Sequence, residues 1–373
     1  MYYAKQTVER LRRASQIFIY GARVIAEEIA RCLMDEPYRL NISGFMVSTL
    51  EGNPSELLGL PVITLAEGKR KYCGALIVIA VMERYLDEII AELHRTGFEN
   101  VLLMNYESDL WSEIRGNSYR LYQQGLGTPY LTLEEELSKQ KIRGKASDVR
   151  VYRVQSHMDK VLDTGLDAFP WEVPIQAGAA LTDQKIADIR DNEGENISHK
   201  NRQYCELTAL YWIWKHDCSR YAGLCHYRRH FDLSYDFLEK LSVSDIDVVL
   251  TIPVVNTPDV RTIYARDHIA NDWNEMLKAL HDLQPAYIPA AERLQAGRYY
   301  CGLNMFLTKR EILDNYCNWL FPILARCEER CGEKNDSYQN RYLGFLGERL
   351  LSIYFFHNES RYKIVYAQKT FLR

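Results

Sequence analysis

The stretch YAGLCHYRRHFD, residues 221–232, gathers reactive side chains at the end of an apolar run. Its first residues have the composition of a buried strand, and His226, Arg228 and Arg229 follow where such a strand would end. Guanidinium groups pair bidentately with phosphate oxygens, and a neutral imidazole can ligate a cation. We therefore expect an anion such as a diphosphate here. Structural ion pairs with an acidic loop at residues 191–196 are the alternative role for the two arginines.

Polar residues also stand near the ends of other predicted elements in the second half of the chain. The run VRVYRV alternates as a strand does and leads to Gln155 and His157, and a later strand runs through Asn304 into a helix. Ligands of open α/β sheets lie beyond the carboxyl ends of the strands. A polar loop precedes an apolar helix that starts near Lys200. An anion could bind at the N-terminus of this helix, and the alternative is that the polar residues only cap it. The candidate binding residues are Gln155, His157, Asn196, Lys200, Asn201, His226, Arg228, Arg229 and Asn304.

Three residues are candidates for a catalytic base. His268 and Asp272 are four positions apart in a predicted helix, which places them on one face. Glu348 interrupts the apolar segment YLGFLGERLL, and a carboxylate in apolar surroundings often has a raised pKa that suits a base. Asp272 and Glu348 rank level, because a sequence gives no distances. The alternatives are a structural hydrogen-bonded string for the first pair and a buried ion pair of Glu348 with Arg349 or Arg341.

The first part of the chain has the pattern of a different domain. Residues 16–104 alternate short apolar runs with amphipathic helical segments, which predicts a parallel sheet covered on both faces. The first strand-to-helix turn contains one glycine, Gly21, so the dinucleotide-binding fingerprint is absent. We expect a small Rossmann-like domain used for packing or partner binding, with a phosphate at the helix N-terminus as the alternative. Residues 111–148 are polar and are expected to form a connector.

Composition limits the class of protein. A length of 373 residues exceeds one typical core, and a formal net charge of -4 argues against a general nucleic-acid binder. The nine cysteines are scattered without a CxxC pair, so neither a disulfide framework nor a zinc site is predicted, and no residue is assigned as a metal ligand. No apolar run reaches the length of a membrane span. The expected location is the cytoplasm, with peripheral association at the inner face of the membrane left open.

Six segments resemble, in order, the bacterial family known as domain of unknown function 4422. That family is found among capsular-polysaccharide and exopolysaccharide biosynthesis proteins and is regarded as glycosyltransferases. The loop IRDNEGENIS departs from the family's more usual sequence, so no role is carried over to the acidic and glycine positions that differ. The matching segments, between about residues 150 and 365, are PIQAGAALTD, DNEGENISHKNRQYCELTALYWIW, YAGLCHYRRHF, YARDHIANDW, LNMF and YQNRYLGFLGERLL.

The resemblance implies a glycosyltransferase, specifically a hexosyltransferase. It would move a sugar from a nucleotide-sugar donor, a UDP-sugar above all, to a capsular, exopolysaccharide or O-antigen glycan that is free or lipid-linked. In the GT-A class, which the order of elements resembles, a DxD motif holds a divalent cation against the donor diphosphate. Here arginines occupy the strand end instead, so they are expected to face the diphosphate, and Mn²⁺ or Mg²⁺ is left open as a cofactor.

The predicted fold is therefore α/β with two domains. Residues 1–110 form a Rossmann-like parallel sheet, 111–148 a connector, and 149–373 a GT-A-like nucleotide-sugar transferase domain. The main alternative function is a noncatalytic nucleotide-sugar or glycan-binding component of a polysaccharide assembly complex, which the lack of a DxD motif would suit. An oxidoreductase that uses the first domain is a further alternative, and the missing fingerprint counts against it. Oligomeric state is not predicted.

Overall fold

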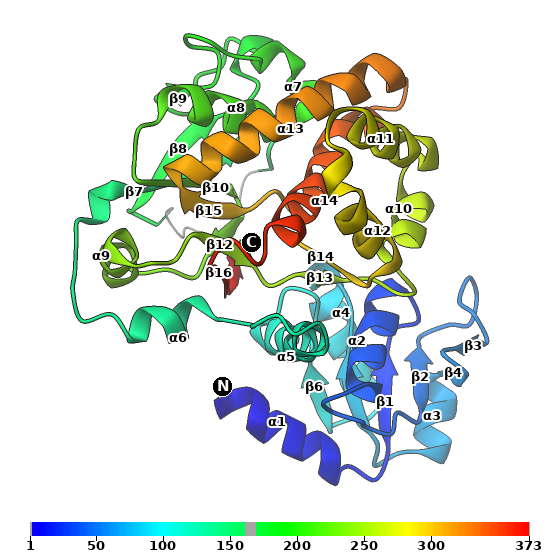
Figure 1. Ribbon diagram of the computed structural model, residues 1–373. Coiled ribbons are helices and arrows are strands. Elements are labelled where there is room, and N and C mark those ends of the chain that lie inside the picture. The colour runs from blue at the N-terminus through cyan, green and yellow to red at the C-terminus, as the bar shows by residue number, and fades with distance from the viewer. Residues whose placement is uncertain (1, 161–168, 373) are drawn as a thin grey trace. The chain divides into compact units, whose positions relative to one another are not determined.

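The computed structural model describes residues 2–160 and 169–372 (Figure 1). The chain divides into two compact units, Met1–Pro129 and Tyr130–Arg373. The boundary lies inside the segment expected to be a connector. That segment contains most of α5 (Asp109–Gly125) and all of α6 (Leu133–Ser138). Helix α5 buries Leu110, Trp111 and Ile114, so it belongs to a packed unit instead of an irregular linker.

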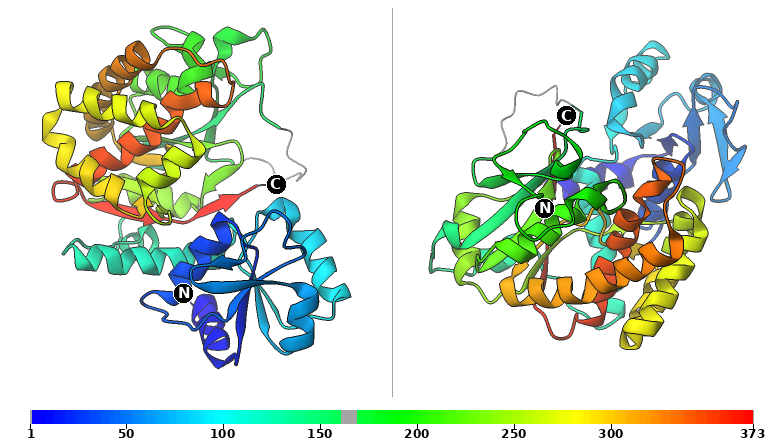
Figure 2. Two further views of the ribbon diagram at one scale, coloured as in Figure 1. Left: turned by 90° about the vertical axis from the view of Figure 1, so that its right-hand side faces the viewer. Right: turned by 90° about the horizontal axis from the view of Figure 1, so that it is seen from above.

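Unit 1 contains a six-stranded sheet in the order β3-β4-β2-β1-β5-β6. All neighbours are parallel except β3, which is antiparallel to β4. Helices lie on both sides of these strands (Figure 2, left). The strands are β1 (Ile17–Tyr20), β2 (Gly44–Val47), β3 (Glu56–Leu57), β4 (Leu60–Thr64), β5 (Leu76–Ile79) and β6 (Val101–Leu103), and the remaining helices are α1 (Tyr2–Arg13), α2 (Val24–Met34), α3 (Leu65–Lys71) and α4 (Leu86–Arg95).

The alternating pattern of residues 16–104 thus correctly predicted a parallel sheet. Every residue of β1, β2 and β5 is buried, as strands covered on both faces must be. The first parallel strand lies at the centre, flanked by β2 and β5, which is the strand order of a doubly wound fold. At its end Gly21 has φ +117, and a side-chain carbon there would lie 3.0 Å from the carbonyl oxygen of Ala80.

Unit 2 contains a nine-stranded mixed sheet whose main path is β16-β12-β15-β10-β7-β8-β9. Strand β15 is antiparallel to both neighbours, whereas the other strands of this path run in one direction. The path and its two added strands comprise β7 (Val149–Gln155), β8 (Glu172–Gln176), β9 (Ile189–Arg190), β10 (Tyr221–His226), β11 (Arg229–Phe231), β12 (Val248–Thr251), β15 (Phe306–Lys309), β16 (Ile364–Ala367) and β17 (Lys369–Phe371). A separate pair is β13 (Val254–Val255) with β14 (Tyr299–Tyr300).

Helices cover both faces of this sheet (Figure 1). One face packs against α6 and α9, where Leu137 and Leu238 join Tyr221 of β10 in an apolar cluster. The other face contacts α8 and α13. The helices that follow α6 are α7 (Asn201–Tyr204), α8 (Leu207–His216), α9 (Tyr235–Val243), α10 (Val260–Asp267), α11 (Ala270–Leu283), α12 (Ile288–Ala296), α13 (Arg310–Cys331) and α14 (Tyr342–His357).

Three sequence expectations about these elements were wrong. The apolar helix predicted from Lys200 is interrupted at Cys205, where φ is +52, so α7 and α8 are separate. The helix predicted to carry His268 and Asp272 on one face is also interrupted, because His268 has an extended backbone and ends α10. Asn304 lies before β15 and not within a strand, since its φ of +50 is incompatible with extended structure.

Candidate functional site

Three residues with unusual backbone conformations lie around one point of unit 2. Cys205, Leu303 and Asn304 have φ values of +52, +71 and +50, a region that side chains other than glycine rarely adopt. The Asn304 amide Nδ2 donates to Glu206 Oε1 at 2.6 Å and to the Gly344 carbonyl oxygen at 3.2 Å. Such strained positions persist only where the surrounding structure enforces them, and they concentrate at functional sites.

The break between α7 and α8 is held by a buried hydrogen-bond network. Asn201 Nδ2 donates to the Cys205 carbonyl oxygen at 2.7 Å and to Thr208 Oγ1 at 3.0 Å. Thr208 Oγ1 in turn donates to Asp191 Oδ2 at 2.6 Å, and the Gly178 amide donates to the same oxygen at 2.9 Å. Asp191 is 0% exposed, so its carboxylate fixes this loop and leaves Glu206 at the start of α8.

Two carboxylates meet at this point. Glu348 of α14 accepts the Leu303 amide at Oε1, 2.9 Å away, and pairs through Oε2 with Arg349 at 2.7 Å. Burial raises the pKa of Glu348, the Arg349 charge opposes this effect, and the neighbouring Glu206 adds to it. Burial likewise raises the pKa of Glu206, against the Asn304 hydrogen bond and nearby arginine charges. The two groups therefore influence each other's ionisation.

His226 ends β10 beside these carboxylates. Its Nε2 donates to the Leu303 carbonyl oxygen, so His226 and Glu348 hold the carbonyl and the amide of the same residue. Burial lowers the pKa of His226 to about 4, which the Leu303 hydrogen bond opposes and the charge of Arg229 reinforces. The imidazole is therefore neutral at pH 7, and its Nε2 is already engaged in this structural contact.

Arg228 and Arg229 lie in the hairpin between β10 and β11, where His226 pairs with Arg229. Both guanidinium groups lie 5.4 Å from the ring of Phe371 in β17. The Nε of Arg228 is buried and has no hydrogen-bond partner among the described residues. Within residues 2–160 and 169–372 no ion pair joins Arg228 to the acidic loop, whose Glu195 pairs with Lys215 instead. Arg228 is therefore not paired with the acidic loop, and its charge acts on Asp159 instead.

Asp159 and Arg341 complete the group. Asp159 follows β7, and its Oδ2 accepts the Ser156 amide at 2.7 Å. Burial raises the pKa of Asp159, while the charges of Arg228 and Arg341 lower it. The residues that share this electrostatic environment at the carboxyl ends of β7 and β10 are called the carboxyl-edge cluster: Asp159, Glu206, His226, Arg228, Arg229, Asn304, Arg341 and Glu348.

Some of the candidate binding residues make contacts that hold neighbouring loops and helices. Gln155 Nε2 donates to the Ile186 carbonyl oxygen at 2.8 Å. Asn196 Nδ2 donates to backbone oxygens of its own loop. Lys200 forms an ion pair with Glu328 of α13 at 2.7 Å. Asn201 is engaged in the α7–α8 break. Gln155, Asn196, Lys200 and Asn201 are therefore held by contacts outside the cluster. His157 is different, because its Nδ1 is buried and has no hydrogen-bond partner in the described part of the chain.

The two remaining base candidates are separated by the helix break. Asp272 is 1% exposed and forms an ion pair with Lys334 at 2.8 Å. His268 stacks on Phe345 with ring centroids 4.0 Å apart. Burial lowers the pKa of His268 to about 4, with a further contribution from Arg349. His268 therefore borders the cluster through α14, whereas Asp272 pairs with Lys334, which is not a member of the cluster.

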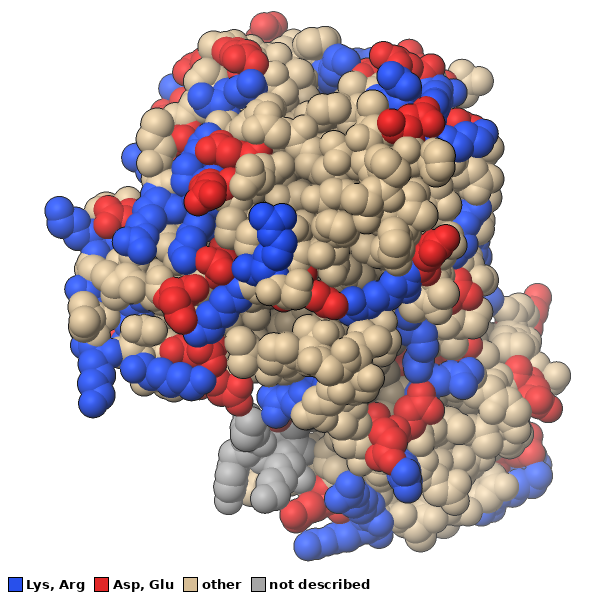
Figure 3. Space-filling view, viewed as in Figure 1, with Lys and Arg blue, Asp and Glu red and all other residues tan. Residues whose placement is uncertain are grey.

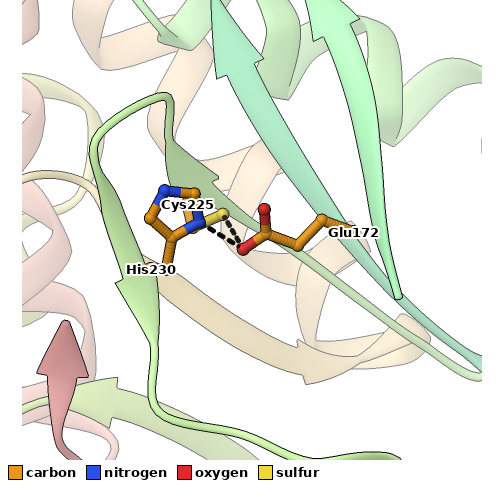
Figure 4. Close-up of side chains that lie close together, drawn as sticks. All are labelled: Glu172, Cys225 and His230. Atoms are coloured by element: carbon orange, nitrogen blue, oxygen red, sulfur yellow. Dashed lines mark hydrogen bonds and ion pairs between the residues drawn. The ribbon is translucent and has the colours of Figure 1, made fainter. Parts of the chain in front are cut away.

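A second polar group lies beneath the hairpin (Figure 4). His230 Nδ1 donates to Glu172 Oε1 at 2.6 Å, and the Cys225 thiol donates to the same oxygen at 3.3 Å. All three residues are buried, and their atoms could in principle ligate a transition metal. However, Arg153 Nε lies 3.5 Å from the other Glu172 oxygen, and His230 Nε2 lies 3.2 Å from the Tyr227 carbonyl oxygen. This hydrogen-bonded arrangement supports the turn that carries Arg228.

Two observations concern the surface and the membrane. On the face seen in Figure 3, basic side chains are interspersed with acidic ones, which does not offer the continuous basic surface of a nonspecific nucleic-acid binder. Among the helices of the described chain, none combines the length and apolar character needed to cross a bilayer.

Comparison with known proteins identifies the family. Residues 163–359 match the family described as Domain of unknown function (DUF4422). The chain belongs to this family. No curated protein matches this DUF4422 member.

One solved structure is informative for this DUF4422 member. It is described as the WbbM bifunctional glycosyltransferase in its apo form, and it is 27% identical with a TM-score of 0.54. The match covers 60% of this chain and 45% of that chain, so the DUF4422 member matches less than half of the solved protein. A Rex-family repressor, RSP, gives 16% identity and a TM-score of 0.23 over 34% of this chain and 67% of that chain, too low to support an argument. The DUF4422 member is thus a mixed α/β protein of a glycosyltransferase-like family.

Three members of the cluster were missed as binding or catalytic candidates in the sequence: Asp159, Glu206 and Arg341. Glu206 lies within the motif CELTALYW and was interpreted as part of a continuous apolar helix. Arg341 was considered only as an ion-pair partner of Glu348. A carboxylate at the start of an otherwise apolar helix is the sequence signal that could have indicated Glu206.

Proposed function

We propose that this protein is a hexosyltransferase that moves a sugar from a nucleotide-sugar donor to a glycan hydroxyl. The observation that carries the proposal is the carboxyl-edge cluster, which combines arginines with carboxylates of raised pKa in a protein similar to a glycosyltransferase. Glycosyl transfer requires both functions, because negative charge develops on the leaving diphosphate while the acceptor hydroxyl loses a proton.

Arg228 and Arg229 are the proposed ligands of the donor diphosphate, with Arg341 beside them. Guanidinium groups offer two parallel donors to phosphate oxygens, and fixed positive charge stabilises a departing diphosphate. The buried, unpartnered Nε of Arg228 supports this role. His157 and Asn304 are proposed to contact the same donor, and His226 to position the backbone of Leu303.

The donor is proposed to be a UDP-sugar. The proposed acceptor is a capsular, exopolysaccharide or O-antigen glycan, free or lipid-linked, on the cytoplasmic side of the membrane. Since arginines provide positive charge at the strand end, we propose that transfer does not depend on Mn²⁺ or Mg²⁺. The sequence feature that favours the alternative, a noncatalytic nucleotide-sugar binder, is the lack of a DxD motif at the end of β10.

The test is an incubation of the purified protein with UDP-, GDP-, CMP- and dTDP-sugars and a set of acceptor glycosides. Nucleotide release and the mass of the glycoside product are measured, with EDTA and with Mn²⁺ in parallel. The proposal expects one nucleotide class to give a glycoside product at similar rates with EDTA and with Mn²⁺. Binding of a nucleotide sugar without release would support the noncatalytic alternative, and neither binding nor release would reject both functions.

A further inference from the structure

The carboxyl-edge cluster contains three carboxylates, and they differ in how their oxygens are used. Both oxygens of Glu348 are engaged, one by the Leu303 amide and the other by Arg349. Glu206 has only Oε1 in a hydrogen bond with another residue. Its Oε2 accepts none from the other described residues, and the backbone amide of Glu206 itself adds a hydrogen bond to the carboxylate. Glu206 is only half-buried, so its carboxylate keeps capacity for a further hydrogen bond.

Asp159 also has one oxygen that accepts no hydrogen bond from the described residues, but its setting is different. Its bonded oxygen closes a turn to Ser156, three residues earlier in the same loop. Glu206 instead accepts a hydrogen bond from Asn304, which lies 98 residues away in the chain. The backbone around Glu206 is also fixed, because Asn201 donates to the Cys205 carbonyl oxygen and to Thr208 across the α7–α8 break. A base must be held within a fraction of an ångström of its productive position, and packed elements do this better than loops. Glu206 meets that requirement better than Asp159.

The position of Asn304 is itself tightly defined. Its Nδ2 donates to both Glu206 and the Gly344 carbonyl oxygen, so its amide hydrogens are committed. The backbone on either side is fixed by the contacts of Leu303 with His226 and Glu348. A side chain at Gly347 would place its first carbon 3.3 Å from Asn304 Oδ1. The carboxylate of Glu206 is therefore oriented by a residue with little freedom to move.

The electrostatic balance at Glu206 also suits proton transfer. Burial raises its pKa, which strengthens it as a base, whereas Asn304 and the charges of Arg341 and Arg229 stabilise the ionised form. A general base works best when its pKa lies near the operating pH and it remains largely ionised. The opposing influences at Glu206 favour that compromise.

We propose that Glu206 accepts the proton of the acceptor hydroxyl through Oε2, with Asn304 as its positioning residue. This inference rests on the proposed glycosyl transfer. The acceptor oxygen forms a bond to the anomeric carbon as its O–H bond breaks and the proton moves to Oε2. The bond from that carbon to the diphosphate oxygen breaks, and the electron pair leaves with the diphosphate beside the arginines. A single displacement of this kind inverts the anomeric configuration.

The decisive comparison is between wild type, Glu206→Gln and Glu195→Gln. The first variant retains an oxygen that can accept from Asn304 but cannot accept a proton at neutral pH. The control removes a charge from an exposed loop residue outside the cluster. Transfer is followed with the panel of nucleotide sugars described above, and donor affinity is measured by calorimetry. We expect Glu206→Gln to lower kcat by about 100-fold or more with donor Kd within about twofold, as loss of a general base predicts, and Glu195→Gln to be unchanged.

A second variant separates chemistry from structure. Glu206→Ala leaves space for a small carboxylate, so added formate should restore part of the lost kcat, and formate should not affect Glu195→Gln. The product of the wild type should have the inverted configuration by NMR. Undiminished kcat in Glu206→Gln, or retained configuration, would overturn the assignment of Glu206 while leaving glycosyl transfer intact. A wild type that neither binds nor consumes any nucleotide sugar would overturn the proposed function and this inference with it.

Discussion

The side-chain amide of Asn304 lies 2.6 Å from the carboxylate of Glu206, although 98 residues separate them in the chain. Asn304 itself has a positive φ, and Glu206 directly follows Cys205, which also has a positive φ. The contact joins the start of α8 to the segment before β15, next to the end of β10. The contact therefore lies within the carboxyl-edge cluster and joins two of its members.

Removal of the Asn304 side chain should affect catalysis more than donor binding. Asn304→Gly keeps the left-handed backbone easy to adopt, whereas Asn304→Ala adds strain of about 1 kcal/mol at φ +50. Both variants should lose at least about tenfold in kcat, and only the alanine variant should show the additional loss of stability. Urea unfolding and steady-state kinetics on the two variants measure these effects separately. Equal kcat in Asn304→Gly and wild type would show that Glu206 does not depend on this contact.

Two glycines of α14 permit the close packing beneath the cluster. A side-chain carbon at Gly344 would lie 3.0 Å from Cys205 Sγ, and one at Gly347 would lie 2.6 Å from Leu207 Cδ1. Gly347→Ala should therefore destabilise the protein by about 1–3 kcal/mol through overpacking. Gly125→Ala is the matched control, because nothing lies within 4 Å of the added carbon. Chemical denaturation should show a lower midpoint for Gly347→Ala alone, and an unchanged midpoint would contradict the packing described.

The buried pair of His230 and Glu172 should be costly to break. Both side chains are 0% exposed, and loss of one partner leaves the other polar group buried without its main contact. His230→Ala is expected to lower the free energy of unfolding by about 1–3 kcal/mol, because a buried group loses its hydrogen-bond partner. Lys278→Ala, which breaks an exposed pair with Glu275, should cost at most about 1 kcal/mol. Guanidinium denaturation of both variants provides the comparison, and similar losses would argue against a supporting role for the buried pair.

Acid should destabilise the fold partly through His226. Its folded pKa is lowered from 6.5 to about 4, so the unfolded chain binds the proton more readily between these values. Stability contributed by the neutral imidazole is present above pH 6.5 and is lost as pH falls toward 4. Carboxylates with raised pKa, such as Glu206, act in the opposite direction. The difference in unfolding free energy between wild type and His226→Gln should therefore shrink from pH 7 to pH 4, and a constant difference would contradict this account.

Much of the fold could be predicted because its strands have distinctive periodicity. The apolar runs at β1, β5 and β10 are buried as strands in a covered sheet must be, and polar residues stand at and just after the end of β10. Five residues proposed from the sequence, namely His226, Arg228, Arg229, Asn304 and Glu348, contribute to one electrostatic environment. Position at a strand end or within an apolar helix was sufficient to identify them as candidates.

Residues whose setting depends on distant contacts could not be predicted. The break at Cys205 has a positive φ without glycine, so no local signal separates α7 from α8. Lys200 had the type and place of an anion ligand, yet it pairs with Glu328, 128 residues away. The tertiary contacts of these residues decide their surroundings, and such contacts are not encoded in spacing along the chain.

The central claim is that the arginines at the end of β10 bind the diphosphate of a nucleotide sugar. We would measure thermal stabilisation by UDP-, GDP-, CMP- and dTDP-sugars for three proteins. These are wild type, the double variant Arg228→Ala with Arg229→Ala, and a control with the same charge change at two exposed positions, Arg202→Ala with Arg220→Ala.

A ligand that binds only the folded state at 100 times its Kd adds about 2.7 kcal/mol of stability. The account predicts that one nucleotide class stabilises wild type and the control equally, and that the cluster variant loses this response. Equal stabilisation of all three proteins would show that the arginines do not bind the diphosphate, and the donor site described here would be wrong.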